Sequence, residues 1–286
     1  MGAKKIKRGS GMKFRWPNNA KSAVSLSFEY DAESVEWGYS RNIEGAFDIG
    51  GFSPQFGVPR VLELLNKHDI KGTFFVPGWD AERYPDSIKE IAEDGHEIAA
   101  HGYTHENFAK LTPNEEKEVF EKAHKILTDI TGAPPRGFRA AAYGRPISAK
   151  TLSFCHNMGY IYDSSFMDDD EPYQLKIDGK FVNMIEIPWA WPLNDISFMS
   201  PPFSSGMSLV LPQRKPQWIL ELWKEEFDGL HDEVGFFNLV IHPRDIGRVS
   251  RMPILEGIVS YMKRYNVWFA TYSQVADLCL KQLIER

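Results

Sequence analysis

The chain has 286 residues, of which 43% are hydrophobic, 13% aromatic and 25% charged. This composition excludes an intrinsically disordered chain and is typical of a soluble globular protein with a large core. The net charge of -6 disfavours polyanionic partners such as nucleic acid. No apolar run approaches the roughly 20 residues that a membrane helix needs. We therefore expect a cytoplasmic protein with neither nucleic acid nor membrane as a partner.

The first part of the chain, residues 1–18, is predicted to be a flexible basic tail, followed by a single domain over residues 19–286. The opening stretch "MGAKKIKRGSGMKFRWPNN" carries positive charge, but no apolar segment follows it, so it does not resemble an export signal. Cys155 and Cys279 lie far apart and outside any CxxC pattern. They predict neither a disulfide framework nor a thiolate metal site.

Short β-rich runs alternate with helix-period segments along the whole chain. The predicted strands are residues 23–28, 73–77, 97–100, 137–140, 160–164, 184–188, 236–241 and 267–271. The predicted helices are residues 59–68, 86–93, 113–131, 148–158, 216–230, 253–265 and 273–283. The third of these helices has the clearest start, because Thr112, Pro113 and Glu115 supply an N-cap, an N1 proline and a capping-box acid. Alternation of this kind predicts a parallel sheet.

Eight such units without a dividing linker favour one α/β domain, a distorted (β/α) TIM-like barrel of seven or eight parallel strands. A doubly wound open sheet is the alternative, but its GxGxxG fingerprint follows none of the predicted strands. Residues 32–58, 166–182 and 194–215 are long and irregular. Segments of this length in a compact domain are typical of covers over a site or of interfaces.

Two acids follow the first predicted strand, in "AVSLSFEYDAES". If the extended geometry persists to Asp31, then Glu29 and Asp31 project from the same face of the strand. The alternative is a solvated strand end whose acids face water. The functional interpretation is favoured because the strand is apolar enough to be central, and the carboxyl ends of barrel strands form the active face.

Two histidines four residues apart follow the third predicted strand, in "EIAAHGYTHENFA". An HxxxH pair is often accidental, and a lone buried histidine is usually a packed core residue. Here His101 ends a strand, Gly102 lets the backbone turn, and the acids of the first strand lie at the same end of the fold. One helical turn would bring both imidazoles onto one face. Two imidazoles and one carboxylate leave an open position for water, as a catalytic zinc site requires.

Three further strand ends supply polar or aromatic groups. They are Arg139 in "GFRAAAYG", Trp189 in "EIPWAW" and His242 in "NLVIHPRD". Considered alone, Arg139 could form a structural ion pair as readily as serve a catalytic role. His242 could equally cap a helix or a loop. The convergence of five strand ends on groups suited to one reaction favours an active site.

These residues resemble the polysaccharide deacetylases of the NodB-homology type, also called carbohydrate esterase family four. The resemblance covers most of the chain through "SFEYDAE", "GTFFVPG", "DGHEIAAHGYTHEN", "TGAPPRGFRA", "EIPWAW" and "VIHP". The resemblance is strongest to the intracellular branch of this family, which has allantoinases and cyclic imide hydrolases as relatives. The resemblance implies a distorted (β/α) barrel, hydrolysis of a non-peptide C–N bond, and a divalent metal, usually zinc.

The resemblance also implies roles for particular residues. The implied metal ligands are Asp31, His101 and His105. Glu29 stands where the family keeps its general base, Arg139 where an arginine orients that base, and His242 where a histidine acts as the acid. In the intracellular branch the first acid is commonly an aspartate, so Glu29 is one methylene longer. Some allantoinase-like relatives with a glutamate here are thought to work without metal, so the metal requirement stays open.

The aromatic residues Trp189, Trp37 and Tyr39 are candidates for an apolar wall that binds the substrate. Three functions follow as hypotheses. The first is metal-dependent deacetylation of an N-acetylated sugar or peptidoglycan-like substrate, the second is hydrolysis of a small cyclic amide, and the third is an inactive binding protein on the same fold. The expected partners are a small-molecule or amino-sugar substrate and further copies of the chain in a dimer or tetramer.

Overall fold

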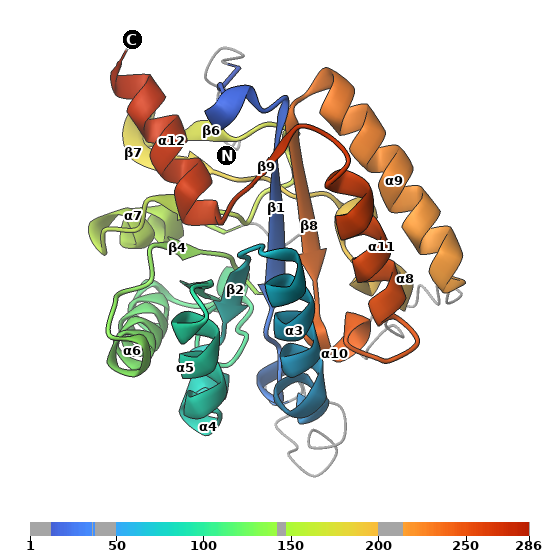
Figure 1. The fold of residues 1–286 in the computed structure, drawn as a ribbon. Coiled ribbons are helices and arrows are strands. Elements are labelled where there is room, and N and C mark those ends of the chain that lie inside the picture. The colour runs from blue at the N-terminus through green and yellow to red at the C-terminus, as the bar shows by residue number, and fades with distance from the viewer. Residues whose placement is uncertain (1–12, 36, 38–49, 142–146, 200–213, 286) are drawn as a thin grey trace.

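The computed structural model describes residues 13–35, 37, 50–141, 147–199 and 214–285 (Figure 1). Within these ranges one curled sheet of nine strands has the order β6-β7-β5-β4-β3-β2-β1-β8, with β9 also pairing with β1. The strands are β1 (Ser22–Glu29), β2 (Thr73–Val76), β3 (Glu97–Ala100), β4 (Gly137–Phe138), β5 (Tyr162–Asp163), β6 (Tyr173–Ile177), β7 (Lys180–Glu186), β8 (Phe236–Ile241) and β9 (Val267–Phe269). Every pairing is parallel except β6 with β7.

The predicted distorted barrel is confirmed as a curled, mostly parallel sheet in the form of a half-barrel. All eight predicted strands are present, although β4 and β5 are shorter than predicted. Among the described residues, one isolated parallel bridge joins Asn194, in the segment after β7, to Val240 of the edge strand β8. The sequence analysis missed β6, although Asp178 and Gly179, with φ of 50° and 81°, form a typical Asp-Gly hairpin turn.

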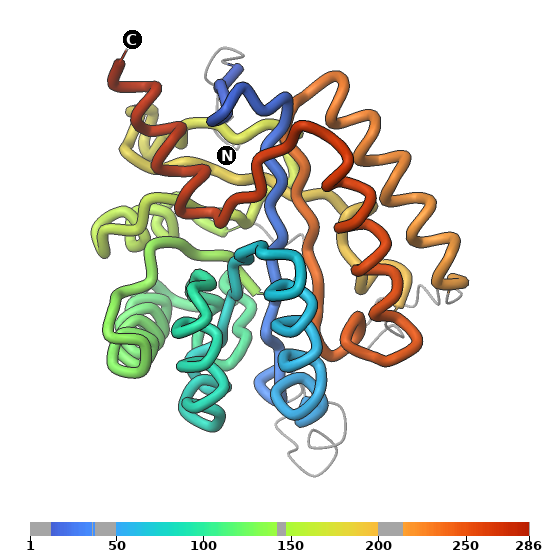
Figure 2. Tube along the Cα trace, viewed as in Figure 1, coloured from blue at the N-terminus to red at the C-terminus, as the bar shows by residue number. Residues whose placement is uncertain are grey.

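Helices surround the sheet, and each parallel strand is joined to the next by a helical or irregular crossover (Figures 1 and 2). The longer helices are α3 (Val58–His68), α5 (Pro85–Glu93), α6 (Pro113–Thr131), α7 (Ala149–Asn157), α9 (Pro216–Glu233), α11 (Met252–Met262) and α12 (Tyr272–Ile284). The shorter ones are α4 (Gly78–Arg83), α8 (Ile196–Met199) and α10 (Pro243–Ile246). The capping box predicted for α6 is confirmed, with both Thr112–Glu115 hydrogen bonds formed. No helix in the described ranges has the length and apolar character needed to span a membrane.

The side chains of the central strand β1 alternate between an apolar face and a polar face. Because side chains alternate along a strand, Val24, Leu26 and Phe28 all belong to the large buried cluster shared with α3, α9 and α11. On the opposite face Ser25 donates a hydrogen bond to the carbonyl of Ala270, just after β9, and Ser27 donates one to the carbonyl of Leu239 in β8, at 3.0 and 2.9 Å. On this face β1 therefore presents small polar groups that leave room for charged side chains.

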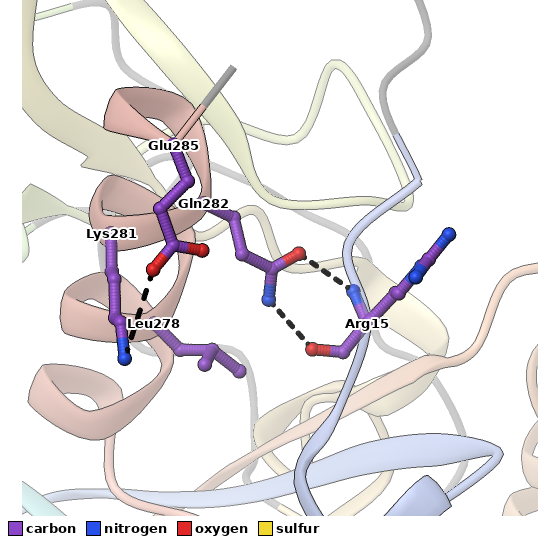
Figure 3. Close-up of a pocket in the computed structure, with 5 residues that line it drawn as sticks. All are labelled: Arg15, Leu278, Lys281, Gln282 and Glu285. Atoms are coloured by element: carbon purple, nitrogen blue, oxygen red, sulfur yellow. Dashed lines mark hydrogen bonds and ion pairs between the residues drawn. The ribbon is translucent and has the colours of Figure 1, made fainter.

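The N-terminal segment before β1 packs on the domain near the amino ends of the strands. Phe14 and Trp16 lie against the second buried cluster, which includes α12. The backbone N–H and carbonyl of Arg15 form hydrogen bonds of 3.0 and 2.7 Å with Gln282, in a surface pocket beside Lys281 (Figure 3). Residues 1–12 of the predicted tail lie outside the described residues.

His96, between α5 and β3, provides a test of the fold through its pH dependence. The side chain is 5% exposed, its Nδ1 accepts the Gly72 N–H at 3.0 Å, and its ring lies edge-on to Phe74. Burial lowers the pKa of His96 to about 4. The unfolded chain takes up this proton near pH 6.5. The stability that His96 contributes is therefore lost as the pH falls from 6.5 towards 4.

We expect His96→Asn to reduce the pH dependence of stability, because the amide oxygen still accepts the Gly72 N–H but does not titrate. Between pH 7 and pH 5 the free energy of unfolding of the parent should fall by about 1–2 kcal/mol more than that of the variant. Urea unfolding at the two pH values measures the difference. The same pH dependence in both proteins would contradict the prediction.

Candidate active site

The first two acids lie where β1 leaves the sheet. The strand ends at Glu29, and Asp31 has a left-handed backbone, with φ of 36°. Extended geometry therefore does not persist to Asp31, and a kink after Glu29 brings the two carboxylates to the same site. Glu29 and Asp31 are each 1% exposed. A non-glycine residue with positive φ costs about 1–3 kcal/mol and is found where surrounding contacts hold it.

The two histidines lie on the loop that follows β3. The predicted helical turn between His101 and His105 is wrong, because residues 101–105 form no helix. Instead Gly102 and His105 have left-handed backbones, with φ of 76° and 58°. The Glu106 carboxylate closes this tight loop by accepting the N–H groups of Tyr103 and Thr104 at 2.9 and 2.7 Å. The imidazole rings still face each other edge to face, with centroids 5.2 Å apart.

The side chains of Asp31, His101 and His105 are buried and could hold a metal ion, since one ligand atom from each lies within 4.8 Å of the others. The His101 Nε2 lies 3.8 Å from Asp31 Oδ1, and the His105 Nε2 lies 3.6 Å from Asp31 Oδ2. Two atoms that each bind one tetrahedral zinc at about 2.1 Å are about 3.4 Å apart. The donor types and their separations therefore fit a zinc ion.

Two atoms of this cluster have the unfilled bonding capacity that a metal ligand requires. Within the part of the chain that the structure describes, the buried His101 Nε2 and Asp31 Oδ1 have no hydrogen-bond partner. The other nitrogen of His101, Nδ1, donates to the Arg139 carbonyl at 2.7 Å. This hydrogen bond fixes the tautomer and leaves the Nε2 lone pair directed at the acids, an arrangement common to metal-binding histidines.

Arg139 lies at the end of β4 and is 1% exposed. Its guanidinium donates to Glu29 Oε1 at 3.1 Å and to the hydroxyls of Ser27, Ser164 and Tyr272 at 3.1, 2.9 and 2.7 Å. It also lies 4.2 Å from the centroid of the Phe75 ring. A buried guanidinium held this firmly keeps a fixed position, so it can fix the orientation of the Glu29 carboxylate.

His242 lies at the end of β8 and is fully buried. Its Nε2 lies 3.1 Å from Glu29 Oε2, and its Nδ1 donates to Asp195 Oδ1 at 2.6 Å. Asp195 Oδ2 accepts the His242 backbone N–H at 2.9 Å. The sequence analysis missed Asp195, which lies in a segment predicted to be irregular. The only signal was an acid beside Asn194, between the apolar residues Leu193 and Ile196.

The buried charges shift one another's pKa values. Burial alone would lower the pKa of His242, but the carboxylates of Asp195 and Glu29 outweigh it and hold that pKa well above its usual range. Burial would likewise raise the pKa of Glu29, but His242, His101 and Arg139 hold it well below its usual range. Burial lowers the pKa of His105 to about 4. At neutral pH the arrangement is a Glu29 carboxylate beside a protonated His242 and a neutral His105.

The predicted aromatic wall is only partly described. Trp37 stacks on Trp79 with ring centroids 6.4 Å apart, and Tyr39 lies outside the described residues. Trp189 is 4% exposed and packs edge-on against Trp191, with ring centroids 5.1 Å apart. Contact of these rings with a substrate stays a prediction.

Comparison with known proteins agrees with this geometry. The polysaccharide deacetylase family matches residues 40–162. The peptidoglycan deacetylase of Helicobacter pylori is 30% identical over 262 residues, which cover 82% of this chain and 87% of the relative.

Two solved structures match over almost their whole lengths. A Mycobacterium smegmatis protein assigned to the polysaccharide deacetylases has a TM-score of 0.85 and 31% identity, covering 96% of this chain and 94% of the other. The Puue allantoinase has a TM-score of 0.80 and 26% identity, covering 97% of each chain. On this evidence the chain belongs to the polysaccharide deacetylase family, hydrolases that act on carbon–nitrogen bonds other than peptide bonds.

Proposed function

We propose that this protein is a metal-dependent hydrolase that removes the acetyl group from an N-acetylated amino sugar. The observation that supports this most directly is the buried cluster of Asp31, His101 and His105, with Glu29 and His242 beside it. This cluster combines a set of zinc ligands with a base and an acid within contact distance. The identity to the Helicobacter pylori peptidoglycan deacetylase favours an acetamido substrate.

In this proposal Asp31, His101 and His105 hold the metal, most suitably zinc. When bound, the metal would supply Lewis acidity that lowers the pKa of water and polarises the amide carbonyl. Glu29 accepts the proton of the attacking water, because its carboxylate stays ionised between Arg139 and His242.

The proton donor in this proposal is His242. A departing amine is a poor leaving group until its nitrogen is protonated, so an acid must lie on that side of the amide. His242 enters the reaction protonated because Asp195 and Glu29 stabilise the imidazolium. Asp195 also holds the ring in place through its bond to Nδ1. Arg139 holds Glu29 in position and keeps its carboxylate ionised until it accepts the proton of the water.

Hydrolysis of a small cyclic amide is the second candidate. Two observations favour it: the reacting side chains of Glu29 and His242 are 1% and 0% exposed, and the allantoinase structure matches 97% of this chain. Buried reacting groups suit a small substrate that enters a closed site better than a polymer that lies in an open groove.

The substrate class is tested by assaying N-acetylglucosamine oligomers, allantoin, hydantoin and succinimide side by side with zinc-loaded protein. We expect release of acetate from the acetamido sugars. Turnover of the cyclic compounds alone would support the second candidate. A zinc-loaded protein that binds one of these compounds and converts none would contradict both and support the inactive binding protein.

Elemental analysis tests the metal ligands. We expect about one divalent metal per chain in the parent and a large loss in His105→Ala, because one of three protein ligands is removed. His156→Ala, which changes a histidine of α7 outside the cluster, is the matched control and should keep the metal. Equal metal content in the parent and His105→Ala would exclude His105 as a ligand.

Kinetics test the acid and the base. Glu29→Gln keeps the size of its side chain and His242→Asn keeps a polar group, but neither new side chain can transfer the proton, so kcat/KM should fall about 10²–10⁴-fold in each. The metal content of both variants should stay near that of the parent, because neither residue belongs to the proposed ligand set. Activity within a few-fold of the parent in either variant would refute the role given to that residue.

A further inference from the structure

The short helix α4 (Gly78–Arg83) touches both of the segments that supply the candidate metal ligands. It follows β2, the strand between β1 and β3, and lies at the same end of the sheet as the site (Figure 1). One segment is the turn after β1, which contains Asp31. The other is the loop after β3, which contains His101 and His105. These segments are far apart in sequence, so their relative position depends on contacts such as these.

The first contact is made by the side chain of Asp80, which is fully buried. Its Oδ2 accepts the Ala32 N–H at 3.0 Å and the Ser34 hydroxyl at 2.5 Å, and its Oδ1 accepts the Ser34 N–H at 3.0 Å. Three donors from the turn that follows Asp31 thus converge on one carboxylate. Through the side chain of Asp80, α4 therefore holds the turn after Asp31 in one conformation.

The second contact is made by the backbone of α4. The Gly78 N–H donates to the Gly102 carbonyl at 3.0 Å, and the Trp79 N–H donates to the Tyr103 carbonyl at 2.9 Å. A side chain at Gly78 would be crowded, because an added Cβ would lie 3.0 Å from both Ala123 and Tyr103. The His101–His105 loop is therefore joined to the same helix whose Asp80 holds the turn after Asp31.

The backbone of Asp31 shows why such support is needed. Its φ of 36° is a conformation that a residue with a side chain rarely adopts. Without contacts that hold it, the turn would relax to an ordinary conformation and move the carboxylate away from the two imidazoles. The hydrogen bonds from Ala32 and Ser34 to Asp80 begin one residue after Asp31, so they act directly on this turn.

We propose that Asp80 is a positioning residue for the metal site, which holds Asp31 in its left-handed conformation and in register with the His101–His105 loop. The inference rests on the proposed metal site. Asp80 does not touch the substrate or the metal in this proposal. Its effect reaches the ion through the backbone of residues 32–34.

The test measures zinc affinity directly, by competition with a chromogenic chelator at pH 8, on the full-length protein without substrate. In Asp80→Asn the amide has one acceptor oxygen in place of two, so part of the three-donor arrangement is lost. We expect the zinc dissociation constant to rise about 10–100-fold, the range for residues that orient metal ligands. Unchanged zinc affinity in this variant would overturn the inference.

A second variant separates hydrogen bonding from charge, because Asp80→Asn also removes a negative charge near the site. Ser34→Ala removes only the hydroxyl donor at 2.5 Å and leaves every charge in place. We expect its zinc dissociation constant to rise about two- to tenfold. If Asp80→Asn does not fold, the zinc affinity of Ser34→Ala alone tests the inference. An unchanged zinc dissociation constant in Ser34→Ala would then overturn it.

The control is Glu116→Gln on α6, which makes the same kind of change in another buried carboxylate. The Glu116 carboxylate accepts a hydrogen bond from Thr151 at 2.7 Å. It should melt at a lower temperature without zinc but bind zinc as the parent does. A merely structural role for Asp80 would give this same result in Asp80→Asn. Failure of the parent to bind zinc would instead refute the proposed metal site, and the inference with it.

Discussion

The interaction on which the rest of the site depends is the buried carboxylate of Glu29, held between the guanidinium of Arg139 and the imidazole of His242 at 3.1 Å on each side. An isolated carboxylate in this environment would become protonated, because burial disfavours the charged form. Two cationic neighbours reverse this and hold the pKa of Glu29 well below its usual range. The fold therefore keeps a carboxylate ionised where little solvent reaches it.

The half-barrel makes this possible through the small side chains on its inner face. Ser27 from β1 and Ser164 after β5 leave space for Arg139 and also bond to it, while Tyr272 at the start of α12 reaches it from a third direction. Tyr272 in turn donates to Asn238 of β8. A charged side chain in a core is tolerated only when its donors are matched in this way.

Two of the three proposed metal ligands have a different kind of backbone from the groups proposed to move protons. The groups proposed to move protons lie at the ends of regular strands, where the sheet itself holds them: Glu29 ends β1 and His242 follows β8. Asp31 and His105, proposed as metal ligands, have positive φ. Each adjoins segments whose N–H groups are accepted by a carboxylate, Asp80 in one case and Glu106 in the other. Strained backbone is found where surrounding contacts over-determine it.

The sequence alone determined the eight parallel strands, the longer helices and six residues of the candidate site, because hydrophobic period, caps and polar residues at strand ends are local signals. Only the tertiary structure decided that His101 and His105 meet across a non-helical loop, and that Asp195 reaches His242 across 47 residues. Left-handed backbone and long-range hydrogen bonds leave no periodic signal, since they depend on which distant segments pack together.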